Sequence, residues 1–127
     1  MQFRVARHTN KIEKISEFYT KIIGLEILGN FKNHSNYDGI FIGKPYKDWH
    51  LEFTTTHEEV NHQFDEDDCL VFYPESQYEY DAIIERLEIN QIEIIISKNP
   101  YWNTNGISIK DPDGFVVIIS SLKINEE

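Results

Sequence analysis

The sequence predicts an α+β fold built from two successive βαβββ modules. Two segments, 11–23 and 77–89, carry apolar residues at helical spacing. Short β-rich segments surround each predicted helix in the same order. The two halves also align at an offset of about 66 residues, at which His50-Leu51-Glu52-Phe53 falls over Val116-Val117-Ile118-Ile119. We therefore interpret the chain as an internal duplication.

The first predicted helix spans 11–23. Asn10 stands at its N-cap position with Glu13 three residues later, which is the pattern of a capping box. Gly24 is expected to end the helix. Its apolar face comprises Ile12, Ile15, Phe18, Tyr19, Ile22 and Ile23.

The second predicted helix spans 77–89. Ser76 and Glu79 form the matching cap pair in front of it. Its apolar face comprises Tyr80, Ile83, Ile84 and Leu87.

The other periodic segments are predicted to be strands, because they are rich in β-branched and aromatic residues. Asp111-Pro112-Asp113-Gly114 joins the last two of them, and Pro and Gly at these turn positions favour a tight hairpin. The predicted strands are 3–6, 25–28, 39–43 and 50–55 in the first module and 69–73, 92–96, 106–110 and 115–120 in the second.

The composition excludes several partners. In 127 residues, 22 Asp and Glu against 12 Lys and Arg give a net charge of −10. Such a surface repels phosphate backbones and anionic lipids, so we expect no nucleic-acid partner and no membrane partner. The single cysteine, Cys69, excludes an internal disulfide and is expected to be a small buried apolar residue. With no apolar signal segment at the N-terminus, we expect a cytoplasmic protein.

We expect one domain over residues 1–127, divided into module one (1–56), an acidic linker (57–67) and module two (68–122). Charge runs of this kind are usually solvated. We expect His57 and His62, which lie in the linker, to be solvated as well.

Four features resemble the vicinal oxygen chelate superfamily, which includes glyoxalase I, bleomycin-resistance proteins and extradiol dioxygenases. Arg7-His8-Thr9 closes a first strand, and residues 18–25 (FYTKIIGL) match the superfamily's F-Y-x-x-x-x-G-L helix exit. Leu51-Glu52-Phe53 matches its fourth-strand segment, and residues 111–114 match its D-P-D-G turn. The resemblance covers about residues 3–122. It implies that each module curls into a half-open cup and that the two mixed sheets form a cleft.

In metal-dependent members of this superfamily, each module supplies one ligand from its first strand and one from its fourth. The resemblance places His8 and Glu52 at these positions in module one. An imidazole and a carboxylate suit Zn, Ni, Mn or Fe. One such divalent ion is therefore one expectation, and a site without any metal is an equal one.

Module two departs from the superfamily's pattern. The ligand expected four residues after the D-P-D-G glycine is replaced by Ile118, which cannot bind a metal. The first-strand position falls on Cys69 or Asp68, depending on the register of the strand. The sequence identifies no catalytic residue.

His50 precedes Glu52 by two residues and therefore shares its face of the strand. Together with His8 they would form a two-histidine, one-carboxylate set, as in non-haem iron sites. The competing interpretation is structural: His8 forms hydrogen bonds at a strand end and Glu52 faces solvent.

Aromatic and polar residues in irregular segments are candidates for contacts with a small molecule in the cleft. Such sites are mostly apolar with a few polar groups, and Tyr and Trp supply both. The alternative is that the tryptophans and Tyr101 cover the open edges of the cups. The candidates are His34, Tyr37, Trp49, Tyr101 and Trp102.

The resemblance implies two functions. The first is a metal-independent protein that binds a small aromatic or cationic molecule, as bleomycin-resistance members do. Ile118 favours it, and the net charge would attract cations. The second is a divalent-metal-dependent lyase, isomerase or dioxygenase that uses His8 and Glu52. Its third ligand would be His50, Cys69 or Asp68.

A structural or regulatory dimer without a small ligand is a third function to weigh. Each module needs a neighbour to cover its sheet edges. Small members of the superfamily usually pair, so we expect a homodimer.

Overall fold

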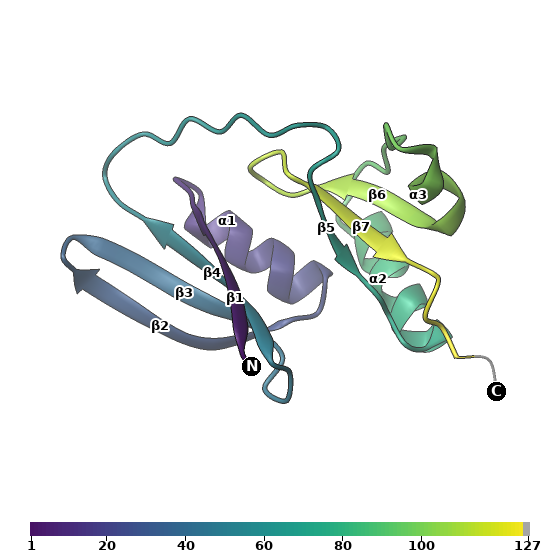
Figure 1. The fold of residues 1–127 in the computed structure, drawn as a ribbon, viewed down its shortest axis with the longest axis horizontal. Coiled ribbons are helices and arrows are strands. Elements are labelled where there is room, and N and C mark those ends of the chain that lie inside the picture. Colours follow the sequence, from purple (N-terminus) through teal and green to yellow (C-terminus); the bar gives the residue numbers. More distant parts are fainter. Residues whose placement is uncertain (126–127) are drawn as a thin grey trace. The chain divides into compact units, whose positions relative to one another are not determined.

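The computed structural model describes residues 1–125, which fold as two compact units, Met1–His62 and a second that begins at Gln63 (Figure 1). Both units combine helices with a sheet, which confirms the predicted α+β class. The first contains β1 (Phe3–His8), α1 (Ile12–Glu17), the π-helical turn η1 (Phe18–Ile22), β2 (Glu26–His34), β3 (Tyr37–Gly43) and β4 (Trp49–Thr55). The second contains β5 (Cys69–Phe72), α2 (Gln77–Ile89), α3 (Pro100–Asn105), β6 (Gly106–Lys110) and β7 (Val116–Ser120).

The first unit is a four-stranded sheet with a helix packed on one face. The strand order is β1-β4-β3-β2, with β1 parallel to β4 and the other pairs antiparallel. Tyr19 of η1 stacks on Phe53 of β4 with 5.2 Å between the ring centroids. The core on this side includes Ile15, Tyr19, Ile42, Leu51 and Phe53, all buried. The candidate site residues of this unit, apart from Trp49, lie on the other face of the sheet.

The start of the first helix differs from the prediction. Lys11 is the N-cap, and α1 has no side-chain cap. The capping box at Asn10 and Glu13 was therefore wrong. Asn10 instead donates to the carbonyl oxygen of Glu58 (2.7 Å) and accepts from the amide of Val60 (2.6 Å). Its amide side chain satisfies two backbone groups of the linker, which a cap bond to its own helix could not do. Gly24 (φ 93°) ends the helix as predicted.

The second unit is a three-stranded sheet in the order β5-β7-β6, with β5 parallel to β7. Helix α2 begins and ends where the sequence predicts, and Ser76 accepts a hydrogen bond from the amide of Glu79 at 3.0 Å. Ile83 and Leu87 of α2 are buried. The interior of the sheet is formed by Ile109, Val117, Ile118 and Ile119, each 0% exposed.

The predicted strand over 92–96 is not formed. Only Ile95 pairs with the sheet, through a hydrogen bond from its amide to the carbonyl of Ser108 (2.8 Å). Helix α3 follows, where the prediction had an irregular segment. Two asparagines fold this region locally: Asn103 bonds both backbone groups of Ser97, and Asn99 caps α3. These local bonds hold the chain away from the extended course that a fourth strand needs.

The turn at Asp111 confirms the predicted hairpin. The amide of Gly114 donates to the Asp111 carbonyl (2.9 Å), and Gly114 has a φ of 88°. The Asp111 side chain accepts from the amides of Asp113 (2.9 Å) and Phe115 (3.1 Å). Within residues 1–125, no helix is long and apolar enough to cross a membrane.

Candidate functional site

One face of the first sheet gathers most of the residues that the sequence singled out. In the parallel ladder of β1 and β4, Arg4 pairs with His50, and His8 pairs with Thr54. Paired residues lie on the same face of a sheet. Tyr37 joins them, because its ring lies 5.5 Å from the ring of His8. We call this surface the aromatic face; it consists of Arg4, His8, Phe31, His34, Tyr37, Phe41, His50 and Glu52.

Phe41 is the centre of the aromatic face. The ring centroid of His50 lies 5.6 Å from that of Phe41, and that of Phe31 lies 5.8 Å away. The guanidinium of Arg4 stands over the Phe41 ring at 5.9 Å. Phe31 crosses the sheet above Gly39, where a Cβ atom would collide with the ring. Glycine at this position therefore lets an aromatic ring lie flat on the sheet.

His8 is held by two hydroxyl groups. Its Nδ1 lies 2.7 Å from the hydroxyl oxygen of Thr54, and its Nε2 lies 3.1 Å from that of Thr56. The Nε2 of His62 lies 2.7 Å from the carbonyl oxygen of His8 and can donate to it. His62 is therefore partly buried and bound to β1, against the expectation that it is solvated. His57 is exposed, as expected. A metal would have to displace a hydroxyl from His8 to bind it.

Glu52 already has a cationic partner. Its carboxylate lies 3.6 Å from the guanidinium of Arg4, and its side chain is only 14% exposed. A half-buried carboxylate needs such compensation, because its charge is poorly hydrated. The sequence analysis did not name Arg4, although alternation places it on the His8 side of β1.

The residues present do not fit a resident metal ion. The chain supplies its own cation to Glu52, and both nitrogens of His8 have hydroxyl partners. The ring of His50 packs edge-on against that of Phe41. Within residues 1–125, no three His, Cys, Asp or Glu side chains come close enough to hold a metal. The predicted set of His8, His50 and Glu52 thus shares a face without forming a donor cluster.

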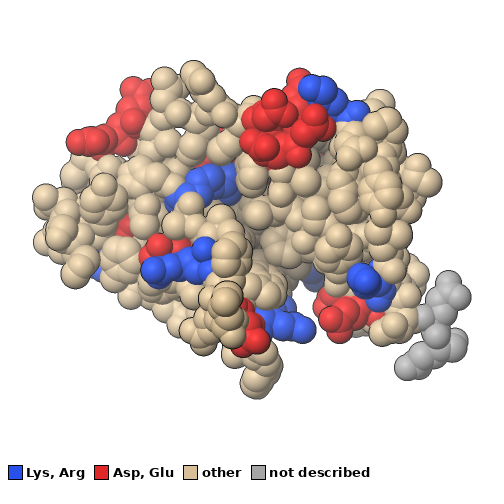
Figure 2. All heavy atoms as spheres, viewed as in Figure 1, with Lys and Arg blue, Asp and Glu red and all other residues tan. Residues whose placement is uncertain are grey.

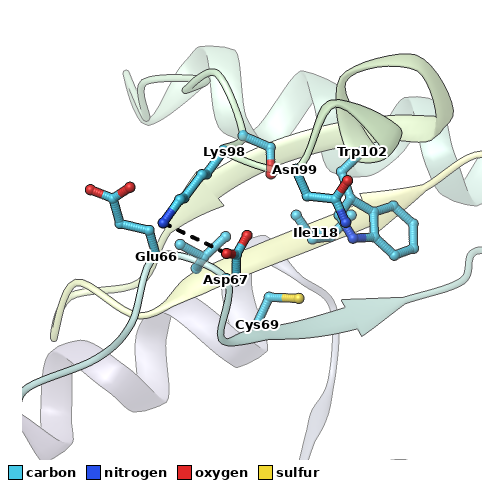
Figure 3. A pocket seen from close by; sticks show the side chains of 9 residues that line it. Glu66, Asp67, Cys69, Lys98, Asn99, Trp102 and Ile118 are labelled. Carbon is cyan, nitrogen blue, oxygen red and sulfur yellow. Dashed lines mark ion pairs between the residues drawn. The ribbon is translucent and has the colours of Figure 1, made fainter.

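The second unit contains a separate pocket of about 390 Å³ (Figure 3). Its apolar wall is formed by Val116, Ile118 and the indole of Trp102. Figure 3 shows the side chain of Lys98 reaching toward Asp67, with Cys69 on the other side of Asp67 from Lys98. The lining residues are Glu66, Asp67, Cys69, Ser97, Lys98, Asn99, Trp102, Val116 and Ile118.

The local fold of 97–105 positions Trp102. Asn99 accepts a hydrogen bond from the amide of Tyr101 at 3.1 Å, and Pro100 occupies the first turn of α3. Tyr101 packs edge-on against Trp102, with 4.9 Å between the ring centroids. Tyr101 is 51% exposed, so it supports the indole from outside the pocket.

Two features define the electrostatics of this pocket. Lys98 and Asp67 form an ion pair at 3.8 Å. Burial raises the pKa of the Cys69 thiol, and the negative charges of Asp68 and then Asp67 raise that pKa further. Cys69 is therefore a neutral thiol near pH 7. It is only partly buried, whereas the sequence predicted a buried residue.

The register of β5 overturns the expectation that the first-strand position of module two falls on Cys69 or Asp68. Cys69 pairs with Val116, and Val71 pairs with Ile118. Cys69 therefore lies on the face of Ile118, and the alternation of the strand places Asp68 on the other face. By the same register Cys69 corresponds to Arg4, and Tyr73, just beyond β5, corresponds to His8.

The remaining candidates are divided between the two units. Trp49 alternates with His50 and lies on the same side as Leu51 and Phe53, away from the aromatic face. His34 is on the aromatic face, with its ring 6.2 Å from that of Phe31. Trp102 lines the pocket of the second unit. The sequence analysis missed Arg4, Asp67 and Lys98, whose roles depend on pairs that form only in the fold.

Comparisons with known proteins agree with this architecture. The family model of the YycE-like N-terminal domain matches residues 3–54, and that of the YycE-like C-terminal domain matches residues 67–121. The uncharacterised protein YycE of Bacillus subtilis (strain 168) is 36% identical over 126 residues, which is 96% of this chain and 88% of that protein. A crystal structure of Bacillus subtilis YycE, whose function is unknown, aligns with a TM-score of 0.81 at 35% identity over 99% of this chain and 91% of that one.

More distant solved structures share the fold. Glyoxalase I of Leishmania major aligns with a TM-score of 0.75 at 16% identity over 97% of this chain and 87% of that one. An antibiotic-binding protein from Streptomyces sp. CB03234 aligns with a TM-score of 0.66 at 18% identity over 94% of this chain and 93% of that one. The chain belongs to the YycE-like family and has the glyoxalase and bleomycin-resistance fold of the vicinal oxygen chelate superfamily, as the sequence resemblance predicted.

Proposed function

We propose that this protein binds a small organic molecule without the help of a metal ion. The observation that carries the proposal is the ion pair between Arg4 and Glu52 on the aromatic face. The guanidinium supplies the positive charge that a metal would otherwise bring to this carboxylate. The chemistry left to the surface is packing and hydrogen bonding, which suits binding better than Lewis-acid catalysis.

The side chains around the ion pair support a binding role. Phe31, Phe41 and His50 form a contiguous group of partly exposed rings, and Tyr37 adds a hydroxyl at its end. Aromatic surfaces of this kind stack on planar groups, while their polar tips select orientation. The fold is also that of an antibiotic-binding protein, so a binding role is compatible with the architecture.

A binding screen tests the proposal. Protein treated with EDTA is titrated with small aromatic compounds, and the unfolding temperature and the heat of binding are measured. We expect binding that survives EDTA and weakens at least tenfold in Phe41→Ala. Loss of a central aromatic contact should cost about 1.4 kcal/mol or more of binding free energy, and about 1.4 kcal/mol corresponds to a tenfold change in affinity. Tyr46→Ala is the matched control, because Tyr46 is 95% exposed in the loop between β3 and β4.

Two other results would replace the proposal. Binding or turnover that appears only with a divalent ion would support the metal-dependent lyase, isomerase or dioxygenase. A chain that binds no compound under either condition would support a structural or regulatory dimer.

We also propose that the protein is a homodimer. Strand β1 lies at one edge of its sheet and exposes Phe3 (64%) and Val5 (42%). An apolar edge strand of this kind needs a cover to avoid uncontrolled association. Light scattering at micromolar concentration should give the mass of two chains, and a monomer at every concentration would contradict this.

A further inference from the structure

The pocket of the second unit combines an apolar wall with a charged rim. Trp102 and Ile118 provide the wall, and Asp67 and Lys98 provide part of the rim (Figure 3). Its volume of about 390 Å³ lies within the range of small-molecule sites. The apolar and charged groups would contact different parts of one occupant.

Acidic groups outnumber basic ones around this pocket. Glu66 and Asp67 line it, Asp65 and Asp68 are their neighbours in sequence, and all four are exposed. Lys98 is the one basic residue among the lining side chains. Figure 2 shows the corresponding red patch, with blue at its margin, over the segment that leads into β5. A rim of this composition attracts cations and repels anions.

The negative electrostatic potential of these carboxylates also acts on the thiol of Cys69, which lines the pocket. After burial, the carboxylates of Asp68 and Asp67 are what raise its pKa. Their negative potential therefore reaches the wall beside Cys69. A positive charge placed there would be stabilised by the same potential.

The ion pair of Lys98 with Asp67 indicates where such a charge can sit. The two side chains are 57% and 53% exposed, so solvent screens the pair and it can exchange readily. Lys98 also lines a second cavity of about 370 Å³, which shares Glu66, Ser97 and Val116 with the first. Its ammonium can thus leave Asp67 and remain beside open space.

We infer that this pocket binds an organic cation, a protonated amine or quaternary ammonium joined to an aromatic or branched apolar group. The cation replaces the Lys98 ammonium beside Asp67, and the apolar part packs against Val116 and the face of Trp102. This inference rests on the proposed small-molecule function and names the ligand class for the second unit.

A matched series of probes tests the inference on the full chain. The probes are 2-phenylethylammonium, 2-phenylethanol and 3-phenylpropionate, which share a phenyl ring and differ in charge. Binding is followed through the indole N–H signal of Trp102 in ¹⁵N–¹H NMR spectra, with the Trp49 signal as an internal reference. We expect the cation to bind at least tenfold more tightly than the alcohol, and the carboxylate to shift nothing.

Variants of the Lys98–Asp67 ion pair test which residue makes the pocket prefer a cation. Asp67→Asn should weaken binding of the cation about tenfold, and Lys98→Gln should leave it unchanged or strengthen it by removing a competitor. Asp48→Asn, an equal charge change at an exposed position of the first unit, should have no effect. Raising the salt concentration should weaken binding of the cation and leave that of the alcohol unchanged.

Other outcomes overturn the inference. Tight binding of the carboxylate that Lys98→Gln abolishes would make this an anion site. Equal binding of all three probes would make it a purely apolar site. If no probe moves the Trp102 signal while the Phe41-dependent binding persists, the inference fails and the proposed function stands; if both are absent, both fail.

Discussion

Glu52 on β4 and Arg4 on β1 form an ion pair with 3.6 Å between carboxylate and guanidinium. The two residues lie two register positions apart in the parallel ladder, on the same face, since Arg4 opposes His50 and Ala6 opposes Glu52. The guanidinium also stands over the ring of Phe41. One arginine therefore neutralises the carboxylate and covers the central ring of the aromatic face.

The strength of this pair can be measured with a double-mutant cycle. Arg4→Ala should lower the free energy of unfolding by about 1 kcal/mol, because it removes the ion pair and the contact with Phe41. Glu52→Gln should cost less, since its amide remains neutral when unpaired. The coupling from urea titrations should be about 0.2–1 kcal/mol and should shrink in 1 M salt. A coupling of zero at low salt would show that the pair does not form in solution.

The N-cap of α2 gives a test of the fold alone. Ser76→Ala removes the hydrogen bond to the amide of Glu79 and should cost about 1 kcal/mol of unfolding free energy. Ser76→Asp should retain stability, because a carboxylate also accepts at this position and favours the helix N-terminus. Equal stability of the alanine and wild-type proteins in chemical denaturation would refute the assigned cap.

The cap of α2 and the segment at 92–96 show where sequence reasoning succeeds and fails. Residues 77–89 were predicted as they fold, because the cap pair and the apolar stripe are local to the helix. The segment 92–96 is equally rich in isoleucine, yet Ile94 is 53% exposed and Ile96 is 89% exposed. Its course is decided by the hydrogen bonds of Asn103 to Ser97 and by helix α3, which lie just C-terminal to the segment. Apolar content alone could not distinguish a strand from this arrangement.

In the candidate site too, features local in sequence could be predicted, and contacts between distant segments could not. Alternation alone placed His50 and Glu52 together on one face, as the register of β4 now has them. The partner of Glu52 could not be predicted, because it depends on the pairing of β1 with β4, which are distant in sequence. The grouping of Trp102 with Asp67 and Lys98 likewise depends on how α3 and the segment before β5 pack within the second unit.

Replacing the buried Ser108 with alanine is not expected to destabilise the fold, whereas most substitutions of buried residues destabilise it. Its hydroxyl is buried without a hydrogen-bond partner among the described residues, and an unsatisfied group of this kind costs about 1–3 kcal/mol. Ser108→Ala should therefore leave the unfolding free energy unchanged or raise it by about 1 kcal/mol. Ser120→Ala is the matched control: the Ser120 hydroxyl donates to the carbonyl of Asn105 at 3.3 Å and accepts from the amide of Leu122 at 3.1 Å, so its loss should destabilise. If thermal unfolding ranks the two variants in the opposite order, Ser108 has a partner in solution.

The raised pKa of Cys69 predicts how stability depends on pH. The folded chain holds this proton more tightly than the unfolded chain, whose thiol titrates near about 8.5. The free energy of unfolding should therefore be independent of Cys69 below that pH and fall as the pH rises through it. Cys69→Ser should remove this fall above about pH 8.5. Asp68→Asn should lower the thiol pKa and speed its alkylation at pH 8, and an unchanged rate would contradict the assigned cause.

Elemental analysis of untagged protein purified without chelators would show whether the folded chain carries a metal ion. The unfolding temperature is recorded on the same sample after addition of Zn, Ni, Mn, Fe or Co. We expect far less than one ion per chain and no stabilisation by any of the five metals, for the wild type and for Glu52→Gln alike. A nearly stoichiometric ion that is lost in His8→Ala or Glu52→Ala would contradict this expectation and establish the metal-dependent alternative.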